Sequence, residues 1–249
     1  MRVGVAGATG HIGALTVAAL ERKGHEVARI SRALGVDLLT GSGLHESLEG
    51  VETLVDCTST AATDVDEAVA YFGTITRNML AAEQKAGVRH HVLLSIVGIH
   101  RFKGNAHCAG KREQERLVEA GPVPWTIVPA TQFHDFAAMV VGWAEHDGVA
   151  TIAPLLVQPI APADIAEVLA EVATAEPQGR YPDVAGPKTE DLVDMARRTN
   201  EVRGHHVRLV PTWSGVLDLS WVGEVLLPGE RARLASTTFD DWLAAGAAP

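Results

Sequence analysis

The chain has 249 residues, of which 47% are hydrophobic and 21% charged, and its formal net charge is -10. These values are typical of a soluble globular protein, and no stretch approaches the roughly 18 uninterrupted apolar residues that a membrane span needs. A negatively charged surface repels phosphate, which disfavours a general nucleic-acid binder. Two cysteines cannot form a framework of several disulfides, and the apolar residues directly after Met1 leave no room for a signal peptide, so we expect a cytoplasmic protein.

The first half of the chain alternates between strand and helix patterns. Strands are expected at 2–5, 26–30, 52–57, 90–98 and 123–130. Helices are expected at 12–23, 44–48, 65–86 and 106–120, the last with Asn105 as its N-cap. Repeated strand–helix–strand order with short connections implies a parallel sheet that is covered on both faces. We therefore expect an α/β fold with a Rossmann-type doubly wound parallel sheet, and we assign residues 1–130 to this dinucleotide-binding core.

After residue 130 the pattern loosens. Helices are expected at 135–146, 164–174, 190–198 and 239–245. Strands are expected at 149–152, 180–185 and 206–210, and an apolar stretch covers 216–227. No low-complexity linker separates the two halves. We therefore expect residues 131–249 to form a smaller C-terminal substrate lobe, packed on the core as one structural unit.

A glycine-rich loop, GATGHIG, lies between the first expected strand and the first expected helix. In a dinucleotide-binding fold Gly7 permits the tight turn, Gly10 lets the backbone approach a pyrophosphate, and Gly13 allows close packing of helix on strand. The helix N-terminus then offers free N–H groups to the anion. This motif in this position predicts a dinucleotide site.

The end of the second strand indicates which dinucleotide binds. An NAD-selective site usually has an acid about 20 residues after the glycine loop, whereas a 2′-phosphate needs cations. The stretch ARISRA contains no acid and places Ser31 and Arg32 at the strand end. This composition predicts NADP as the cofactor; the alternative is that Arg29 and Arg32 are ordinary surface cations.

Four segments together resemble an atypical short-chain dehydrogenase/reductase of the NmrA-like, NAD(P)-binding group. They are GATGHIG, TRNMLAAEQKAGVRHHVLLSIVG, WTIVPATQFHDF and TTFDDWLAAG. The first is shared by a large superfamily, while the joint occurrence of the others is more specific. The resemblance covers nearly the whole chain.

The resemblance implies a set of cofactor-binding residues. At the pyrophosphate it implies Gly7, Thr9, Gly10, His11, Ile12 and Gly13, and at the 2′-phosphate Ser31 and Arg32. Near adenine and its ribose it implies Asp37, Cys57, Thr58 and Ser59. Towards the nicotinamide it implies Ser95, Lys111, Pro129, Thr131 and Gln132.

The chain departs from the family's Tyr-x-x-x-Lys motif at position 107, where His107 replaces the tyrosine and Lys111 is retained. A spacing of four puts both side chains on one helical face. Because the lysine charge disfavours imidazolium, the hypothesis is a mostly neutral His107 that donates a hydrogen bond to a substrate oxygen or relays a proton through water, while Lys111 orients the cofactor ribose. Ser95 is the third catalytic candidate. The alternative is that His107 and Lys111 are unrelated residues on a solvated face.

Other chemistries are less well supported by the sequence. The adjacent histidine pairs have no metal-ligand spacing, so we expect no metal site. Cys108 lacks an orienting carboxylate and is expected to be an inert thiol rather than a nucleophile. Phe133 and His134 follow a strand end and are candidate substrate contacts. Phe133, Phe136, Met139 and Trp143 have helical spacing and could line a pocket, although core packing is the expected role for most of them.

Two functions remain. The first is an NADPH-dependent oxidoreductase or isomerase that acts on a small carbonyl, aromatic or quinone-like compound. The second is a sensor or regulator of the NmrA-like type that binds NADP without turning it over. The retained lysine favours the first and the missing tyrosine favours the second. In either case we expect a small-molecule ligand, no nucleic-acid or membrane partner, and a monomer or homodimer.

Overall fold

The computed structural model describes residues 1–214, 217 and 219–246. Residues 216 and 218 of the expected apolar stretch at 216–227 lie outside the described residues. Among the described residues of that stretch, Leu219–Trp221 form a short 3-10 helix, η2.

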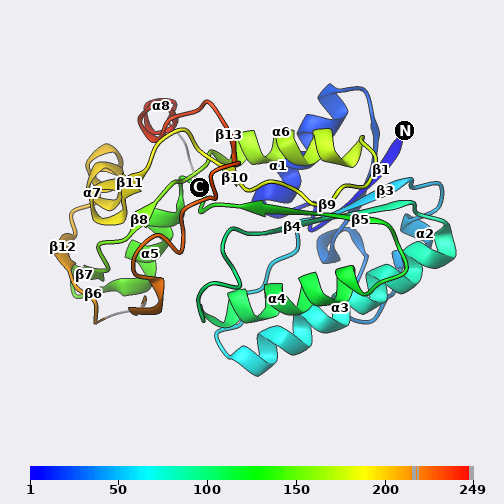
Figure 1. The fold of residues 1–249 in the computed structure, drawn as a ribbon, viewed down its shortest axis with the longest axis horizontal. Helices are drawn as coiled ribbons and strands as arrows, with labels where there is room; N and C mark the ends of the chain where they lie inside the picture. The colour runs from blue at the N-terminus through cyan, green and yellow to red at the C-terminus, as the bar shows by residue number, and fades with distance from the viewer. Residues whose placement is uncertain (215–216, 218, 247–249) are drawn as a thin grey trace.

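A parallel sheet forms the centre of the molecule (Figure 1). Its main strands are β1 (Arg2–Ala6), β2 (Glu26–Ile30), β3 (Thr53–Asp56), β4 (His90–Ile96) and β5 (Trp125–Ala130). Three short strands extend it: β9 (Gly179–Arg180), β10 (Val184–Ala185) and β13 (Arg233–Leu234). The order is β13-β10-β5-β4-β3-β1-β2, with β9 beside β5, and every pair is parallel. The expected doubly wound parallel sheet is confirmed.

Helices cover both faces of the sheet. In Figure 1, α1 (His11–Arg22) and α6 (Pro162–Ala173) lie on one side, and α3 (Val65–Ala86) and α4 (Ala106–Glu119) lie on the other. The short helices α2 (Leu44–Ser47) and η1 (Arg32–Leu34) complete the connections between β2 and β3. Strands β3 and β4 are almost entirely buried, which agrees with the apolar residues at their centres, Leu54–Val55 and Val92–Leu94.

Helices α3 and α4 approach closely because of Gly110. A Cβ at this position would lie 2.2 Å from Cδ2 of Phe72 on α3, so only glycine leaves room for the ring. The expected N-cap of α4 is confirmed, since Asn105 accepts a hydrogen bond from the backbone of Cys108 at 3.1 Å. These two features place α4 firmly against the sheet.

The lobe has a hydrophobic core of its own. Its helices are α5 (Phe136–Ala144), α7 (Leu192–Arg203) and α8 (Phe239–Ala244). Its strands are β6 (Glu145–His146), β7 (Val149–Ile152), β8 (Leu156–Val157), β11 (Glu190–Asp191) and β12 (Arg208–Pro211). Buried residues such as Val140, Ile152, Met195 and Phe239 pack together there, separately from the clusters on either face of the main sheet.

The second half of the chain departs from the expectations in three places. The expected strand at 180–185 is two strands, β9 and β10, with Pro182, which has no N–H to donate, between them. The expected helix at 190–198 begins at Leu192 and continues to Arg203, because Asp191 caps its start and Gly204 ends it. Finally, α6 and the strands β9, β10 and β13 lie beyond residue 130 yet join the layers of the core.

A buried ion pair joins α3 to β4. His91 Nδ1 and Glu83 Oε1 lie 2.7 Å apart, and both side chains are completely buried. Burial by itself lowers the pKa of His91, but the charge of Glu83 and its hydrogen bond outweigh burial, so that the pKa is raised. The folded state therefore favours the charged imidazolium.

We predict that Glu83→Gln lowers the free energy of unfolding by about 3–5 kcal/mol, the usual cost of leaving one member of a buried pair without its partner. Because the folded pKa of His91 is raised, the pair contributes fully below about pH 6.5 and less as pH rises through the folded pKa. Urea unfolding at several pH values should therefore show the widest gap between variant and parent in mild acid. The exposed Glu46→Gln is the control, and a gap that widens with pH would contradict the prediction.

Candidate cofactor and active site

The glycine loop is built on one close contact. Gly7 has a φ of +76°, and its carbonyl accepts a hydrogen bond from the Gly10 backbone at 2.9 Å. A Cβ on Gly13 would lie only 2.0 Å from that same carbonyl oxygen, so α1 can begin here only if residue 13 is glycine. No side chain caps the start of α1, which leaves the first N–H groups of the helix available to an anion.

This loop lies at the switch point of the sheet. From β1 the chain goes to β2 on one side, and β3 lies on the other side of β1. Open parallel sheets bind ligands at such a point, beyond the carboxyl ends of the strands. A cavity of about 580 Å³ is found there, lined by the glycine loop, by residues that follow β2, β3 and β5, and by the last residues of β4.

The structure brings most of the predicted site residues to this cavity. The lining contains Gly7, Thr9, Gly10, His11, Ile12, Ser31, Arg32, Asp37, Cys57, Thr58, Ser59, Ser95, His107, Lys111 and Phe133. Five predicted residues are absent from the lining: Gly13, Pro129, Thr131, Gln132 and His134. Gly13 acts through packing, as described above. Thr131 is buried and donates its hydroxyl hydrogen bond to the Gln158 carbonyl at 2.7 Å.

His134 lies in the lobe and away from the cavity lining. Its side chain is 1% exposed, its ring stacks on Phe239 at 5.5 Å between centroids, and neither ring nitrogen has a hydrogen-bond partner in the structure. Burial lowers its pKa to about 4. His134 is therefore surrounded by aromatic packing, and the neighbouring Phe133 is the one of the two candidates that reaches the cavity.

The end of β2 offers polar groups that suit a phosphate. Ser31 is 8% exposed, and its buried hydroxyl has no hydrogen-bond partner in the structure. Arg32 is exposed beside it and forms no ion pair with any described residue. An unpartnered buried hydroxyl next to an unpaired guanidinium fits a cofactor that brings a phosphate group to this strand end.

The end of β3 is held by a carboxylate that the sequence interpretation missed. Asp56 is fully buried, accepts a hydrogen bond from the Thr58 backbone at 2.8 Å and accepts another from the Gln114 side chain at 2.8 Å. The segment Cys57 to Ser59 is thereby fixed at the cavity wall. Burial raises the pKa of the Cys57 thiol to about 12, so that this thiol stays protonated.

His107 and Lys111 both line the cavity from α4. Lys111 is 4% exposed; its ammonium group donates a hydrogen bond to the Leu94 carbonyl at 3.0 Å and lies 5.1 Å from the centre of the Phe72 ring. Burial, and then the charge of Lys111, lower the pKa of His107 to about 4. Burial also lowers the pKa of Lys111, and the charges of Asp56 and Glu115 oppose this shift. The low pKa of His107 agrees with the hypothesis of a neutral imidazole.

Ser95 belongs to a polar network behind the cavity wall. Its hydroxyl donates to Glu115 at 2.5 Å, and the same buried carboxylate accepts from Arg180 at 2.6 Å and contacts His100 Nε2 at 2.6 Å. Burial raises the pKa of Glu115, but hydrogen bonds from Arg180, Ser95 and His100 outweigh it and leave the pKa lowered. The hydroxyl of Ser95 is therefore already committed to a carboxylate.

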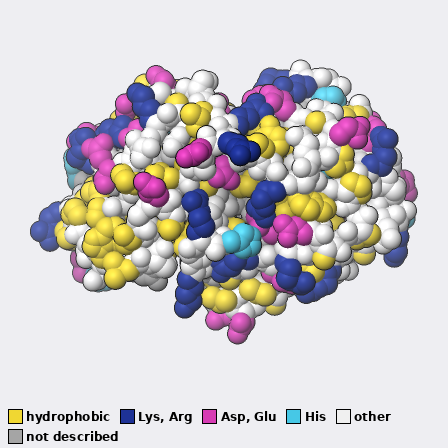
Figure 2. Space-filling view, viewed as in Figure 1, with side chains coloured by type: hydrophobic (Ala, Val, Ile, Leu, Met, Phe, Trp, Pro, Cys, Tyr) yellow, Lys and Arg dark blue, Asp and Glu magenta, His cyan; other side chains and the backbone are white. Residues whose placement is uncertain are grey.

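The apolar residues expected either to line a pocket or to pack in the core take different roles on α5. Met139 lines the cavity and is 45% exposed, while Trp143 is 49% exposed and makes an edge contact with Phe136 at 6.3 Å between ring centres. Hydrophobic side chains also gather over the lobe at the left of the face shown in Figure 2. On the rest of that face positive and negative side chains are interspersed.

Cys108 lies on α4 and is buried, and burial raises the pKa of its thiol.

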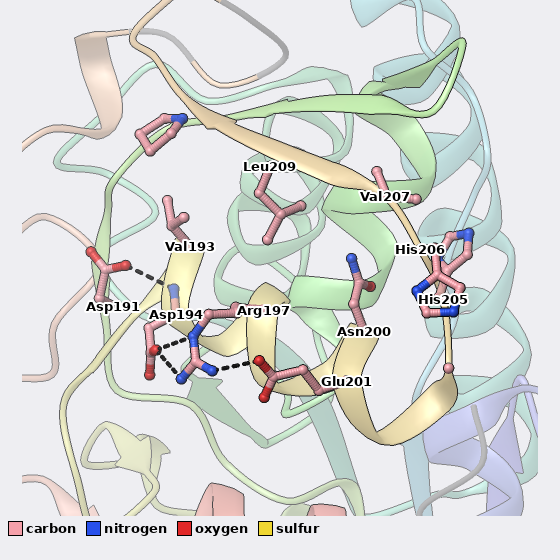
Figure 3. A pocket seen from close by; sticks show the side chains of 12 residues that line it. Asp191, Val193, Asp194, Arg197, Asn200, Glu201, His205, His206, Val207 and Leu209 are labelled. Atoms are coloured by element: carbon pink, nitrogen blue, oxygen red, sulfur yellow. Dashed lines mark hydrogen bonds and ion pairs between the residues drawn. The ribbon is translucent and has the colours of Figure 1, made fainter.

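A larger hollow, of about 870 Å³, lies on the lobe between α7 and β12 (Figure 3). Its cation Arg197 is already paired with Asp194 at 2.8 Å and with Glu201 at 2.7 Å. None of the predicted site residues reaches it. The described residues contain no group of three or more potential metal ligands. No helix in the described part of the chain is both long and apolar enough to cross a membrane.

The sheet order, the glycine loop and the cavity at the switch point define a dinucleotide-binding α/β protein. A sequence model of a family described as NAD(P)H-binding matches residues 7–176, which is more than half of the chain. The chain therefore belongs to this NAD(P)H-binding family, which confirms the resemblance to NAD(P)-binding proteins. A comparison with curated proteins finds no match.

Solved structures share the fold at low sequence identity. An NADPH-dependent quinone oxidoreductase from Escherichia coli, complexed with NADPH, is 18% identical with a TM-score of 0.64, over 84% of this chain and 78% of that chain. A triphenylmethane reductase from Citrobacter sp. is 18% identical with a TM-score of 0.62, over 85% and 79%. A UDP-glucose 4-epimerase from Thermus thermophilus, in complex with NAD, is 18% identical with a TM-score of 0.65, over 90% of each chain.

We predict that Gly13→Ala weakens NADPH binding by at least about tenfold, roughly 1.4 kcal/mol, because the added Cβ must displace the loop from the Gly7 carbonyl. The overpacking should also lower the free energy of unfolding by about 1–3 kcal/mol. Calorimetric titration and thermal unfolding measure the two effects. Gly142→Ala is the matched control, because it lies in α5 with nothing within 4 Å of its added Cβ. Equal NADPH affinities in the two variants would contradict the prediction.

Proposed function

We propose that the chain is an NADPH-dependent oxidoreductase that reduces a small carbonyl, aromatic or quinone-like compound. The observation that carries the proposal is that a single cavity of about 580 Å³ is lined by the glycine loop, by the Ser31–Arg32 strand end and by the His107–Lys111 pair. Ligand pockets usually measure roughly 300–1,000 Å³. The NADPH-dependent quinone oxidoreductase and the triphenylmethane reductase of similar fold support the same class of reaction.

In this proposal the cofactor extends from β2 towards α4. The free N–H groups at the start of α1 hold the pyrophosphate, and Ser31 and Arg32 hold the 2′-phosphate. Cys57, Thr58 and Ser59, fixed by Asp56, line the adenosine end together with Asp37. The Asp37 carboxylate accepts a hydrogen bond from the Leu39 backbone at 2.8 Å, which keeps one of its oxygens occupied.

We predict that Arg32→Ala weakens NADPH binding by roughly 1.5–3 kcal/mol, the usual contribution of a charge-assisted hydrogen bond, and leaves NADH binding almost unchanged. Arg29→Ala is the matched control, because Arg29 lies in β2, three residues before Arg32, but pairs with Glu21 at 2.7 Å and does not line the cavity. Calorimetry with both cofactors measures the effect. Equal affinities of the parent protein for NADPH and NADH would argue against the assignment.

The reaction then uses the pair on α4. When bound, the reduced nicotinamide supplies the hydride. Neutral His107 donates an N–H hydrogen bond to the substrate oxygen, which stabilises the negative charge that develops there. Lys111 uses one N–H for the Leu94 carbonyl and keeps its remaining donors for the ribose hydroxyls of the cofactor. Phe133 and Met139 supply apolar walls for an acceptor of aromatic or quinone-like character.

The test is loss of NADPH absorbance in the presence of a panel of quinones, aldehydes and cationic dyes. With the best acceptor, His107→Ala and Lys111→Ala should each reduce kcat/KM by about 10- to 100-fold, and the exposed His45→Ala should not. Since the pKa of His107 is about 4, its protonation should not alter the rate above about pH 5.5. A His107→Ala enzyme as active as the parent between pH 5.5 and 9 would leave the residue without a role.

A second function follows if the panel gives no turnover. Position 107 carries histidine in place of the family's tyrosine, which favours a sensor that binds NADP without oxidising or reducing it. Tight calorimetric binding of NADPH without consumption by any acceptor would support this reading and would contradict the oxidoreductase.

A further inference from the structure

His11 and Asp135 form an ion pair inside the same cavity. His11 Nδ1 lies 3.0 Å from Asp135 Oδ2, and both residues belong to the lining. His11 is the first residue of α1, and Asp135 directly precedes α5 in the lobe. The contact therefore joins the glycine loop of the core to the entrance of the lobe.

Asp135 is unusually placed for a carboxylate that has one partner. It is 7% exposed, and its second oxygen, Oδ1, is buried without any hydrogen-bond partner in the structure. Although it occupies the N-cap position of α5, it caps no backbone N–H group with its side chain. Burial raises the pKa of Asp135, and the charges of His11 and Arg203, the last residue of α7, only partly oppose the rise.

The carboxylate determines how the imidazole can act. A carboxylate accepts hydrogen bonds, so the ring carries its hydrogen on Nδ1, and Nε2 is left without a protein partner among the described residues. The His11 side chain is 39% exposed, so this nitrogen is open to the cavity and to solvent. A histidine held on one nitrogen by a carboxylate and free on the other is the arrangement of a general acid or base.

The proposed reduction needs such a group. A carbonyl that accepts a hydride must also accept a proton, and His107 cannot readily supply one because its low pKa keeps it neutral. The ammonium group of Lys111 is buried against Leu94 and the Phe72 ring. A proton source must therefore be found elsewhere in the lining.

We propose that His11, oriented by Asp135, is the proton donor of the site, and this assignment rests on the proposed reductase function. The sheet order supports it. Asp135 follows β5, which lies beside β4 and at the opposite end of the main strands from β2. His11 follows β1, and β3 and β4 lie between β1 and β5, so the pair spans the carboxyl ends of the two strands that bring Cys57 and Ser95 to the lining.

The step is balanced as follows. The hydride electron pair forms the new C–H bond, and the π electrons of the C=O bond move to oxygen. That oxygen takes the proton from Nε2 of the doubly protonated His11 ring, whose Nδ1–H stays hydrogen-bonded to Asp135. Neutral His11 then regains a proton from water at the exposed edge of its ring.

The assignment can be tested with two kinds of electron acceptor. An uncharged carbonyl compound needs a hydride and a proton, whereas a cationic triarylmethane dye is neutralised by a hydride alone. For His11→Gln we expect kcat/KM to fall by about 100-fold or more with the best quinone or aldehyde and by less than about threefold with the dye. Asp135→Asn should show the same selectivity with a smaller loss, of about tenfold, because the donor is still present but less well oriented.

Calorimetric titration of the cofactor-free variants gives a readout that does not depend on turnover. Both variants should bind NADPH within about threefold of the parent, since the backbone of the loop and not the imidazole holds the pyrophosphate. A larger loss of affinity would make His11 a cofactor ligand and would overturn the assignment. His146→Gln and Asp147→Asn are matched controls, because this adjacent pair lies 3.3 Å apart with side chains 90% and 89% exposed, outside the cavity.

The remaining outcomes separate the two proposals. Equal losses with the carbonyl compound and the dye, together with lowered thermal stability, would mean that the pair only fastens the lobe to the core, which would overturn the His11 assignment and leave the reductase intact. Reduction of the dye alone by the parent protein would also overturn it. No oxidation of NADPH by either acceptor would overturn the proposed function, and the proton donor with it.

Discussion

The contact between the Gly7 carbonyl and the position of Gly13 is the constraint on which the site depends. Because no side chain can occupy that space, α1 starts directly beyond β1, with its N-terminus at the switch point of the sheet. This fixes the direction of the unsatisfied N–H groups. It also places His11, the first residue of α1, where its side chain contacts Asp135 at the entrance of the lobe. An anion site and a titratable side chain are thus set by one steric condition.

The lobe completes a site that the core begins. Three of the five main strands, β1, β2 and β3, contribute cavity residues directly after their carboxyl ends, and β4 contributes its last residues. Phe133, Asp135 and Met139 come from the passage into the lobe. The lobe has its own hydrophobic cluster. The same half of the chain also contributes α6, β9, β10 and β13 to the layers of the core, and these elements attach the lobe to the sheet. The lobe residues that line the cavity can then vary without altering the sheet.

The sequence predicted those parts of the fold and of the site that depend on neighbouring residues in the chain. The alternating apolar runs and the caps gave the first five strands and the helices between them, and GATGHIG with ISRA gave the cavity residues at the pyrophosphate and at the end of β2. The residues that depend on distant partners were not predictable. His134 follows a strand end as a ligand contact would, yet Phe239, more than a hundred residues later, covers its ring. Nothing in the sequence distinguishes Asp56 and Asp135 from other acidic residues. Their roles are visible only in the structure, where both are buried, Asp56 accepts a hydrogen bond from Gln114, and Asp135 pairs with His11.

The ring of Phe72 has a wider consequence than its position on α3 suggests. It fills the space that a side chain at Gly110 would need, makes an edge contact with His107 at 5.5 Å between ring centres, and lies beneath Lys111. The spacing between two outer helices is therefore transmitted directly to the pair at the cavity. A change that tightened or loosened the contact between α3 and α4 would move His107 and Lys111 even if neither residue changed, so the packing of these helices and the shape of the cavity wall depend on one aromatic ring.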